Sequence, residues 1–126
     1  MSSATPAVAA AELQPLIRGE AAATEAQGRL SGRLVAALHA RALFRVWIPR
    51  SAGGLEAELI PALQTFETLA AGDGATGWAV MIGAGAGWFG GFLEPAAARE
   101  ILGPADAVIA GSGAPSGTAR PTDGGF

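Results

Sequence analysis

Cysteine is absent from the 126 residues, and lysine is absent as well. A chain without cysteine forms no disulfide, does no thiolate chemistry and binds no metal through sulfur. The absence fits a reducing compartment, and the N-terminus lacks the basic start of a secretory signal, so we expect a cytoplasmic protein. All eight basic residues are arginine, and the net charge of −3 gives no reason to expect a nucleic-acid partner.

Residues that commonly carry catalysis or metal binding are also scarce. The single histidine, His39, has no acidic or nucleophilic partner that the sequence places beside it, so we expect a structural role for it. No stretch has the spacing of a metal site, a catalytic triad or a phosphate loop. We therefore predict no catalytic residue and no metal ligand in this chain.

Apolar residues and glycine are abundant, at 50% hydrophobic residues and 19 glycines. This composition predicts a folded chain, and its length suits one modest domain. Apolar residues recur at helical spacing, with proline near helix starts and glycine at helix ends. About five helices are predicted: residues 13–27, a second after Ser31, a third with Pro61 in its first turn and Gly72 at its end, a glycine-rich fourth capped by Asp73 or Thr76, and residues 95–102. The intervening residues 44–49 are expected to be extended.

The character of the sequence changes after Pro104. We assign residues 1–104 to a helical domain, of which 1–11 are expected to be disordered, and residues 105–126 to the start of a β domain. "AVIAGSGAP" alternates as a strand does, and "TDGG" is typical of a hairpin turn. No second strand follows, so we expect a truncated β domain.

The stretch "WAVMIGAGAGWFGG", residues 78–91, has three interpretations. Its G-x-G-x-x-G pattern matches a dinucleotide fingerprint, but no helix follows it, and Asp106 precedes the next predicted strand instead of ending it. Residues 74–93 carry no charge and contain G-x-x-x-G steps, as membrane helices do, but acidic flanks and diluted hydrophobicity argue against a span. We favour a helix of a soluble protein, either clamped between neighbours or facing a cavity.

The order of several segments resembles the N-terminal helical domain of the acyl-CoA dehydrogenase superfamily. These segments are "LFRVWIPRSAGG", the "DGATGW" entry to the glycine-rich helix, "PAAAREILG" and "GSGAPSG" after the first predicted strand. They are most similar to the branch that includes flavin-dependent monooxygenases. The resemblance runs from about residue 30 to 117. It implies a mostly α domain of the acyl-CoA dehydrogenase type, followed by the first strand of an incomplete β domain.

The resemblance implies two groups of site residues. The first would approach the flavin, unless it is an ordinary Gly/Pro/Ser loop: Ser112, Ala114, Pro115 and Gly117. The second would line the substrate cavity: Trp78, Met81, Ile82, Gly85 and Trp88. For the two tryptophans, packing in the core is the favoured alternative.

The function implied is that of a flavin-dependent oxidoreductase that oxidises a CH–CH bond or oxygenates a small organic substrate. The parent protein would use FAD or FMN, form a homotetramer and take a flavin reductase as partner in the monooxygenase case. Aromatic hydroxylases of this branch often carry a histidine on the glycine-rich helix, which has none here, so dehydrogenation and oxygenation both stay open. We expect the 126 residues alone to bind flavin weakly or not at all. The alternative is a stand-alone helical interaction module without catalysis.

Overall fold

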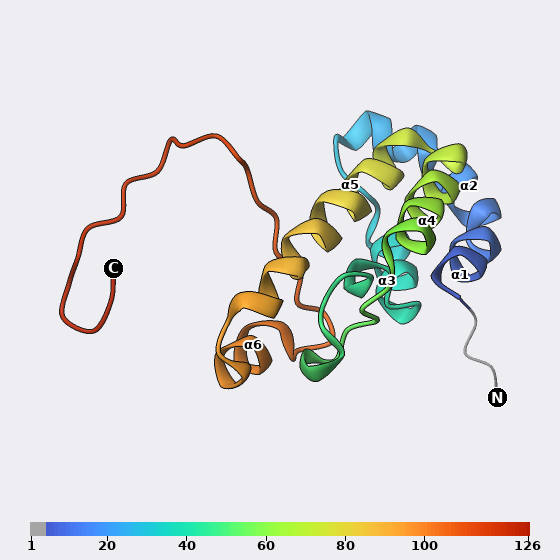
Figure 1. Ribbon diagram of the computed structural model, residues 1–126. Coiled ribbons are helices and arrows are strands. Elements are labelled where there is room, and N and C mark those ends of the chain that lie inside the picture. The colour runs from blue at the N-terminus through green and yellow to red at the C-terminus, as the bar shows by residue number, and fades with distance from the viewer. Residues whose placement is uncertain (1–4) are drawn as a thin grey trace.

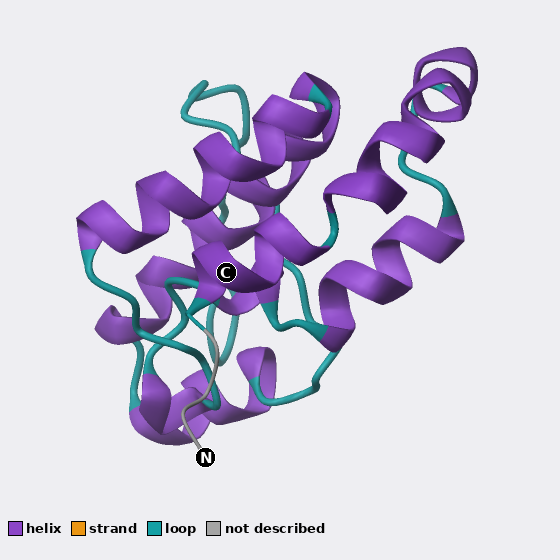
Figure 2. Cartoon of the chain, turned by 90° about the vertical axis from the view of Figure 1, so that its right-hand side faces the viewer, coloured by secondary structure: helices purple, strands orange, loops and turns teal. Residues whose placement is uncertain are grey.

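Helices account for most of the described residues, 5–126, of this computed structural model. Figures 1 and 2 show a mostly helical chain, with no strand among the described residues. In chain order the helices are α1 (Pro6–Glu12), α2 (Gln14–Gln27), α3 (Gly32–Ala40), α4 (Leu59–Gly72), α5 (Gly74–Gly85) and α6 (Pro95–Leu102). Three 3-10 helices complete them: η1 (Leu43–Arg45), η2 (Arg50–Ala52) and η3 (Ala86–Phe92).

Local capping chemistry sets several helix ends where the sequence predicts them. The amide of Leu34 donates to the Ser31 hydroxyl over 3.2 Å at the start of α3. Asp73 caps α5, because its carboxylate accepts from the amide of Thr76 over 2.8 Å. Gly28 ends α2 in the left-handed conformation, with φ of 63°. These caps satisfy backbone groups that the helix itself leaves free.

The predicted N-terminal disorder is wrong for residues 6–11, which belong to α1. Thr5 caps this helix, and Ala9 and Ala10 are buried against the rest of the molecule. Packing of these small apolar residues stabilises a seven-residue helix that is too short to be stable alone. The remaining part of this prediction, residues 1–4, lies outside the described residues.

Residues 44–49 are not extended as predicted. Ala42 adopts the left-handed conformation, with φ of 54°, and the chain then turns through η1. Main-chain hydrogen bonds hold this turn against the residues that precede α4: Leu55 N to Arg45 O at 2.9 Å, Glu56 N to Ile48 O at 3.0 Å and Ala57 N to Val46 O at 2.8 Å. Hydrogen bonds with residues 55–57, about ten positions later in the chain, therefore override the local tendency of an X-Pro sequence to be extended.

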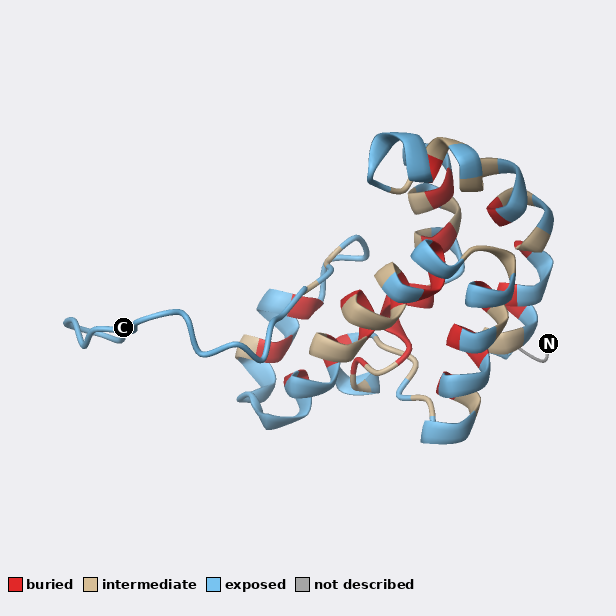
Figure 3. Cartoon of the chain, turned by 90° about the horizontal axis from the view of Figure 1, so that it is seen from above, coloured by how far each residue is buried: buried red, intermediate tan, exposed pale blue. Residues whose placement is uncertain are grey.

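The core lies where α1, α2, α3, α4 and α5 meet, and buried residues in Figure 3 cluster there. Its fully buried large side chains include Ile17, Leu34, Leu38, Leu43 and Leu69. A second, smaller cluster packs η2 against α6: Ile48, Ala52, Ala98 and Leu102. The helical class predicted from the sequence is therefore confirmed.

Helix α5 is clamped by its neighbours through glycines. A Cβ at Gly77 would lie 2.6 Å from the Ala70 Cβ of α4, so the two antiparallel helices cross at close range. A Cβ at Gly83 would lie 2.8 Å from Val108 and 2.9 Å from the Phe44 ring. Close packing thus offsets the low helix propensity of these glycines. Within residues 5–126, no helix combines the length and apolar character that a membrane span needs.

Residues 105–126 form an extended arm, whose first part packs on the helical body through Val108 and Ile109 and whose remainder leaves it (Figures 1 and 3). The predicted "TDGG" turn forms, with a bridge between Thr122 and Gly125. The predicted strand does not form a ladder with any described residue. A strand needs a neighbouring strand edge for its amides and carbonyls, and the described residues offer only helices.

Candidate functional site

Gly85, the last residue of α5, borders two neighbouring cavities. A Cβ at this position would meet nothing within 4 Å, in contrast to the tightly packed Gly83 two residues earlier. Both predicted roles of the glycine-rich helix are therefore present. Some of its glycines fit against neighbouring elements, and Gly85 leaves open space.

The first cavity, which we call the arm cavity, lies between α5, η3 and the beginning of the arm. It measures about 320 Å³. Its lining is almost entirely apolar: Met81, Ile82, Gly85, Ala86, Phe89, Gly111, Ser112 and Gly113. The Ser112 hydroxyl accepts from the Ala114 amide over 3.2 Å, so its own proton is free for donation. The arm cavity thus pairs an apolar wall with one hydroxyl group.

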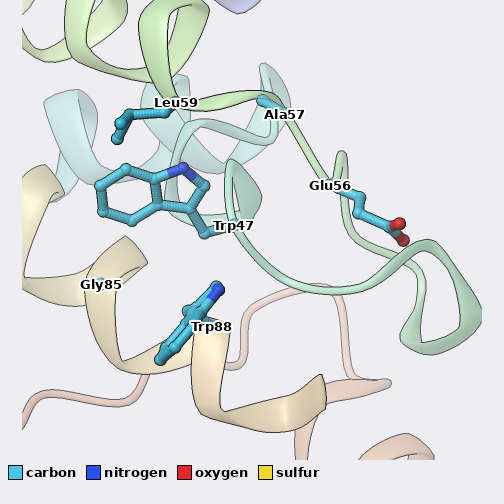
Figure 4. A pocket seen from close by; sticks show the side chains of 6 residues that line it. All are labelled: Trp47, Glu56, Ala57, Leu59, Gly85 and Trp88. Carbon is cyan, nitrogen blue, oxygen red and sulfur yellow. The ribbon is translucent and has the colours of Figure 1, made fainter.

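The second cavity, which we call the indole cavity, measures about 450 Å³. It is lined by Trp47, Glu56, Ala57, Leu59, Gly85 and Trp88. Figure 4 shows Leu59, Trp47 and Trp88 in that order beside Gly85, with the Glu56 carboxylate pointing away from them. Three separate segments supply these walls: the turn after η1, the start of α4 and the passage from α5 to η3.

Exposed aromatic rings continue from the indole cavity along η3. The Trp88 ring is 5.5 Å from Phe89 and 5.0 Å from Phe92, and both contacts are edge-to-face. Trp88 is 54% exposed and Phe92 is 72% exposed. We call these three residues the η3 aromatic cluster. Contiguous exposed apolar side chains are more typical of interaction surfaces than of the rest of a protein surface.

The structure brings four of the predicted site residues together. Met81, Ile82 and Gly85 from the predicted substrate group meet Ser112 from the predicted flavin group in the arm cavity. Trp88 lies in the indole cavity instead. The other predicted residues line neither cavity: Trp78, Ala114, Pro115 and Gly117.

The favoured core role of the two predicted tryptophans is wrong. Trp78 is 64% exposed and Trp88 more than half exposed, whereas Trp47 packs edge-to-face on Phe66 at 5.2 Å. Sequence reasoning missed Trp47 and Leu59 as cavity residues. The only local signals were the place of Trp47 two residues before Pro49 and of Leu59 at a helix start, and neither signal tells what these side chains face.

The remaining sequence features do not form a catalytic, metal or nucleotide site. The G-x-G-x-x-G pattern falls on the end of α5 and on η3, so it does not follow a strand. The His39 ring packs against the Phe44 ring in a tilted arrangement, with centroids 4.8 Å apart, and lines neither cavity. Among residues 5–126, no three acidic or histidine side chains gather as a metal site would require. Arg45 is buried and donates only to main-chain carbonyls among the described residues.

Comparison of the chain with models of known protein families, with curated protein sequences and with solved structures gave no match. No family is therefore assigned to the chain, and the resemblance of its sequence motifs to a known family is a proposal.

Proposed function

We propose that this chain forms the substrate-enclosing helical part of a flavin-dependent oxidoreductase of the acyl-CoA dehydrogenase or flavin monooxygenase type. One observation carries the proposal. Residues that the motif resemblance assigns to substrate and to flavin, from segments about 30 positions apart in the sequence, line one cavity: Met81, Ile82, Gly85 and Ser112.

The lining of the arm cavity suits a flat, largely uncharged ring. Gly111 and Gly113 bring main-chain amides to the surface without side chains, and the Ser112 hydroxyl adds one donor. When bound, FAD or FMN would accept electrons from the substrate or activate oxygen. This chain's own contribution is to exclude water with Ile82 and Phe89 and to place a small organic substrate beside Ser112.

Few polar groups are available to hold the cofactor. The lining contains no charged side chain for a flavin phosphate among the described residues. We therefore expect weak flavin binding by these 126 residues. In the proposed oxidoreductase a β domain and a helical bundle, neither of which residues 5–126 form, would supply the other walls.

A titration of the ¹⁵N-labelled chain with FMN tests the proposal. We expect weak, saturable shifts of amide resonances at Gly111–Gly113 and Ile82, and none at Gly117 or in α2. The variant Gly113→Val should reduce these shifts, whereas Gly117→Val should not. Shifts that spread evenly over the chain, or none at millimolar FMN, would contradict the site. Co-purification of a stoichiometric yellow chromophore would contradict the expected weak binding.

A second candidate, a helical interaction module without catalysis, is supported by the exposed η3 aromatic cluster. Hydrogen exchange and gel filtration separate the two candidates. A self-sufficient module would be monodisperse and would unfold cooperatively. The oxidoreductase proposal predicts association through exposed apolar surface and exchange of the amides of residues 111–120 within the dead time.

A further inference from the structure

The indole cavity shares Gly85 with the arm cavity but lies outside the site proposed for the flavin. All its walls come from residues 47–88, so none belongs to the arm. We infer that it binds a planar, uncharged aromatic molecule of about two fused rings, held against the indoles of Trp47 and Trp88. This inference does not depend on the proposed oxidoreductase function.

One wall of the indole cavity is packed against the core in the absence of a ligand. Trp47 is partly buried and packs on Phe66 of the core at 5.2 Å. Its neighbours Val46 and Ile48 accept main-chain hydrogen bonds from Ala57 and Glu56, so the segments on both sides of the cavity are tied together. A preformed aromatic wall lowers the entropy lost on binding.

The opposite wall is incompletely packed. The Trp88 indole touches Phe89 and Phe92 through ring edges and is still 54% exposed. A flat ligand that covers this indole removes apolar surface from water on both partners. A bound ligand would therefore add packing that the exposed face of Trp88 lacks.

Gly85 keeps the space between the walls open. A Cβ here would meet nothing within 4 Å, whereas a Cβ at Gly87, two residues later, would lie 2.6 Å from the Ile48 Cγ1. Neighbour packing thus explains Gly87 but not Gly85. The backbone at Gly85 offers a flat surface that a ring can approach directly.

The lining directs no charge into the cavity, which favours an uncharged ligand. Glu56 is the only charged residue among the described residues that line the cavity. Its carboxylate accepts from the Arg50 amide over 2.7 Å and points away from the indoles in Figure 4. No free charge therefore faces the cavity to pair with a charged ligand. Its volume of about 450 Å³ lies within the usual range of small-molecule sites.

The three indole N–H resonances of the chain provide the test, with 2-naphthol as the probe. We expect saturable shifts for Trp47 and Trp88 and none for Trp78, which is exposed but lies outside the cavity. 2-Naphthoate and benzyltrimethylammonium, the charged comparison probes, should bind at least about tenfold more weakly.

Two pairs of variants control for folding and for nonspecific adsorption. Gly85→Leu should fill the cavity and weaken 2-naphthol binding at least about tenfold, whereas Gly19→Leu, also in open helical space, should not. Trp88→Ala should weaken binding by a similar factor, whereas Trp78→Ala, which also removes an exposed indole, should not. The amide spectrum of each variant confirms its fold.

Equal shifts of all three indoles, or equal binding by Gly85→Leu and Gly19→Leu, would overturn the inference, because the probe would then adsorb to any exposed ring. Tighter binding of benzyltrimethylammonium than of 2-naphthol would overturn the neutral ligand class, since aromatic walls also attract cations. Failure here leaves the FMN titration at Gly111–Gly113 unaffected.

Discussion

The guanidinium of Arg45 donates a hydrogen bond of 2.7 Å to the carbonyl of Leu102, 57 positions away in the sequence. It also donates to the carbonyls of Ala52, Gly53 and Pro104 over 2.8–3.1 Å. Arg45 is 6% exposed. The main-chain carbonyls replace water around its buried charge, and one of them lies at the C-terminal end of α6, where a cation is favoured. This side chain therefore fixes η1, η2 and α6 to one another and anchors the turn that carries the wall of the indole cavity.

Replacing Arg45 by methionine should lower the free energy of unfolding by about 3 kcal/mol or more, because several carbonyls would lose a charged donor in the interior. Arg41→Met is the matched control. Arg41 pairs with Glu12 on the surface, and its loss should cost about 1 kcal/mol or less. Urea denaturation measures both values. Similar losses for the two variants would show that the buried contacts contribute little.

Gly77→Ala should destabilise the protein by about 1–3 kcal/mol, although alanine is the better helix former. The new methyl group would lie 2.6 Å from the Ala70 Cβ and force α4 and α5 apart. Gly85→Ala, which meets open space, should stabilise by up to about 1 kcal/mol. Thermal melts of the two variants should therefore shift in opposite directions. A rise in both midpoints would contradict the close helix crossing.

Asp73→Ala should cost about 1–2 kcal/mol, since the carboxylate caps α5 by accepting from both the amide and the hydroxyl of Thr76. Asp73→Asn keeps a capping oxygen and should lose less. The exposed Asp106, which caps no helix, serves as the control for a lost negative charge. Urea midpoints of the three variants test the order, and a loss on Asp106→Ala as large as that on Asp73→Ala would contradict it.

Phe92→Ser should leave the free energy of unfolding within about 0.5 kcal/mol of the parent, because this ring lies mostly in solvent. The same change should reduce concentration-dependent association, since it removes the most exposed ring of the η3 aromatic cluster. Val8→Ser on α1 removes an exposed apolar residue elsewhere. Sedimentation velocity at two concentrations should show reduced association for Phe92→Ser only.

The ends of the helices were predictable because they depend on neighbours in the sequence. Ser31 and Asp73 accept from amides three residues ahead, and Gly28 adopts a conformation that glycine reaches without strain. For the glycine-rich helix α5 the sequence left two alternatives, clamping between neighbours or facing a cavity, and the structure shows the first at Gly77 and the second at Gly85. That distinction depends on contacts such as that of Gly77 with Ala70.

The sequence by itself determined a mostly helical chain without cysteine. Tertiary structure alone decided that α1 is ordered, that residues 44–49 form a turn, and that Trp47 is partly buried while Trp78 and Trp88 are exposed. It also decided that the arm has no strand partner among residues 5–126. The physical reason is shared. Caps and helical periodicity act over a few residues, whereas burial, cavities and strand pairing depend on groups that only the folded chain brings together.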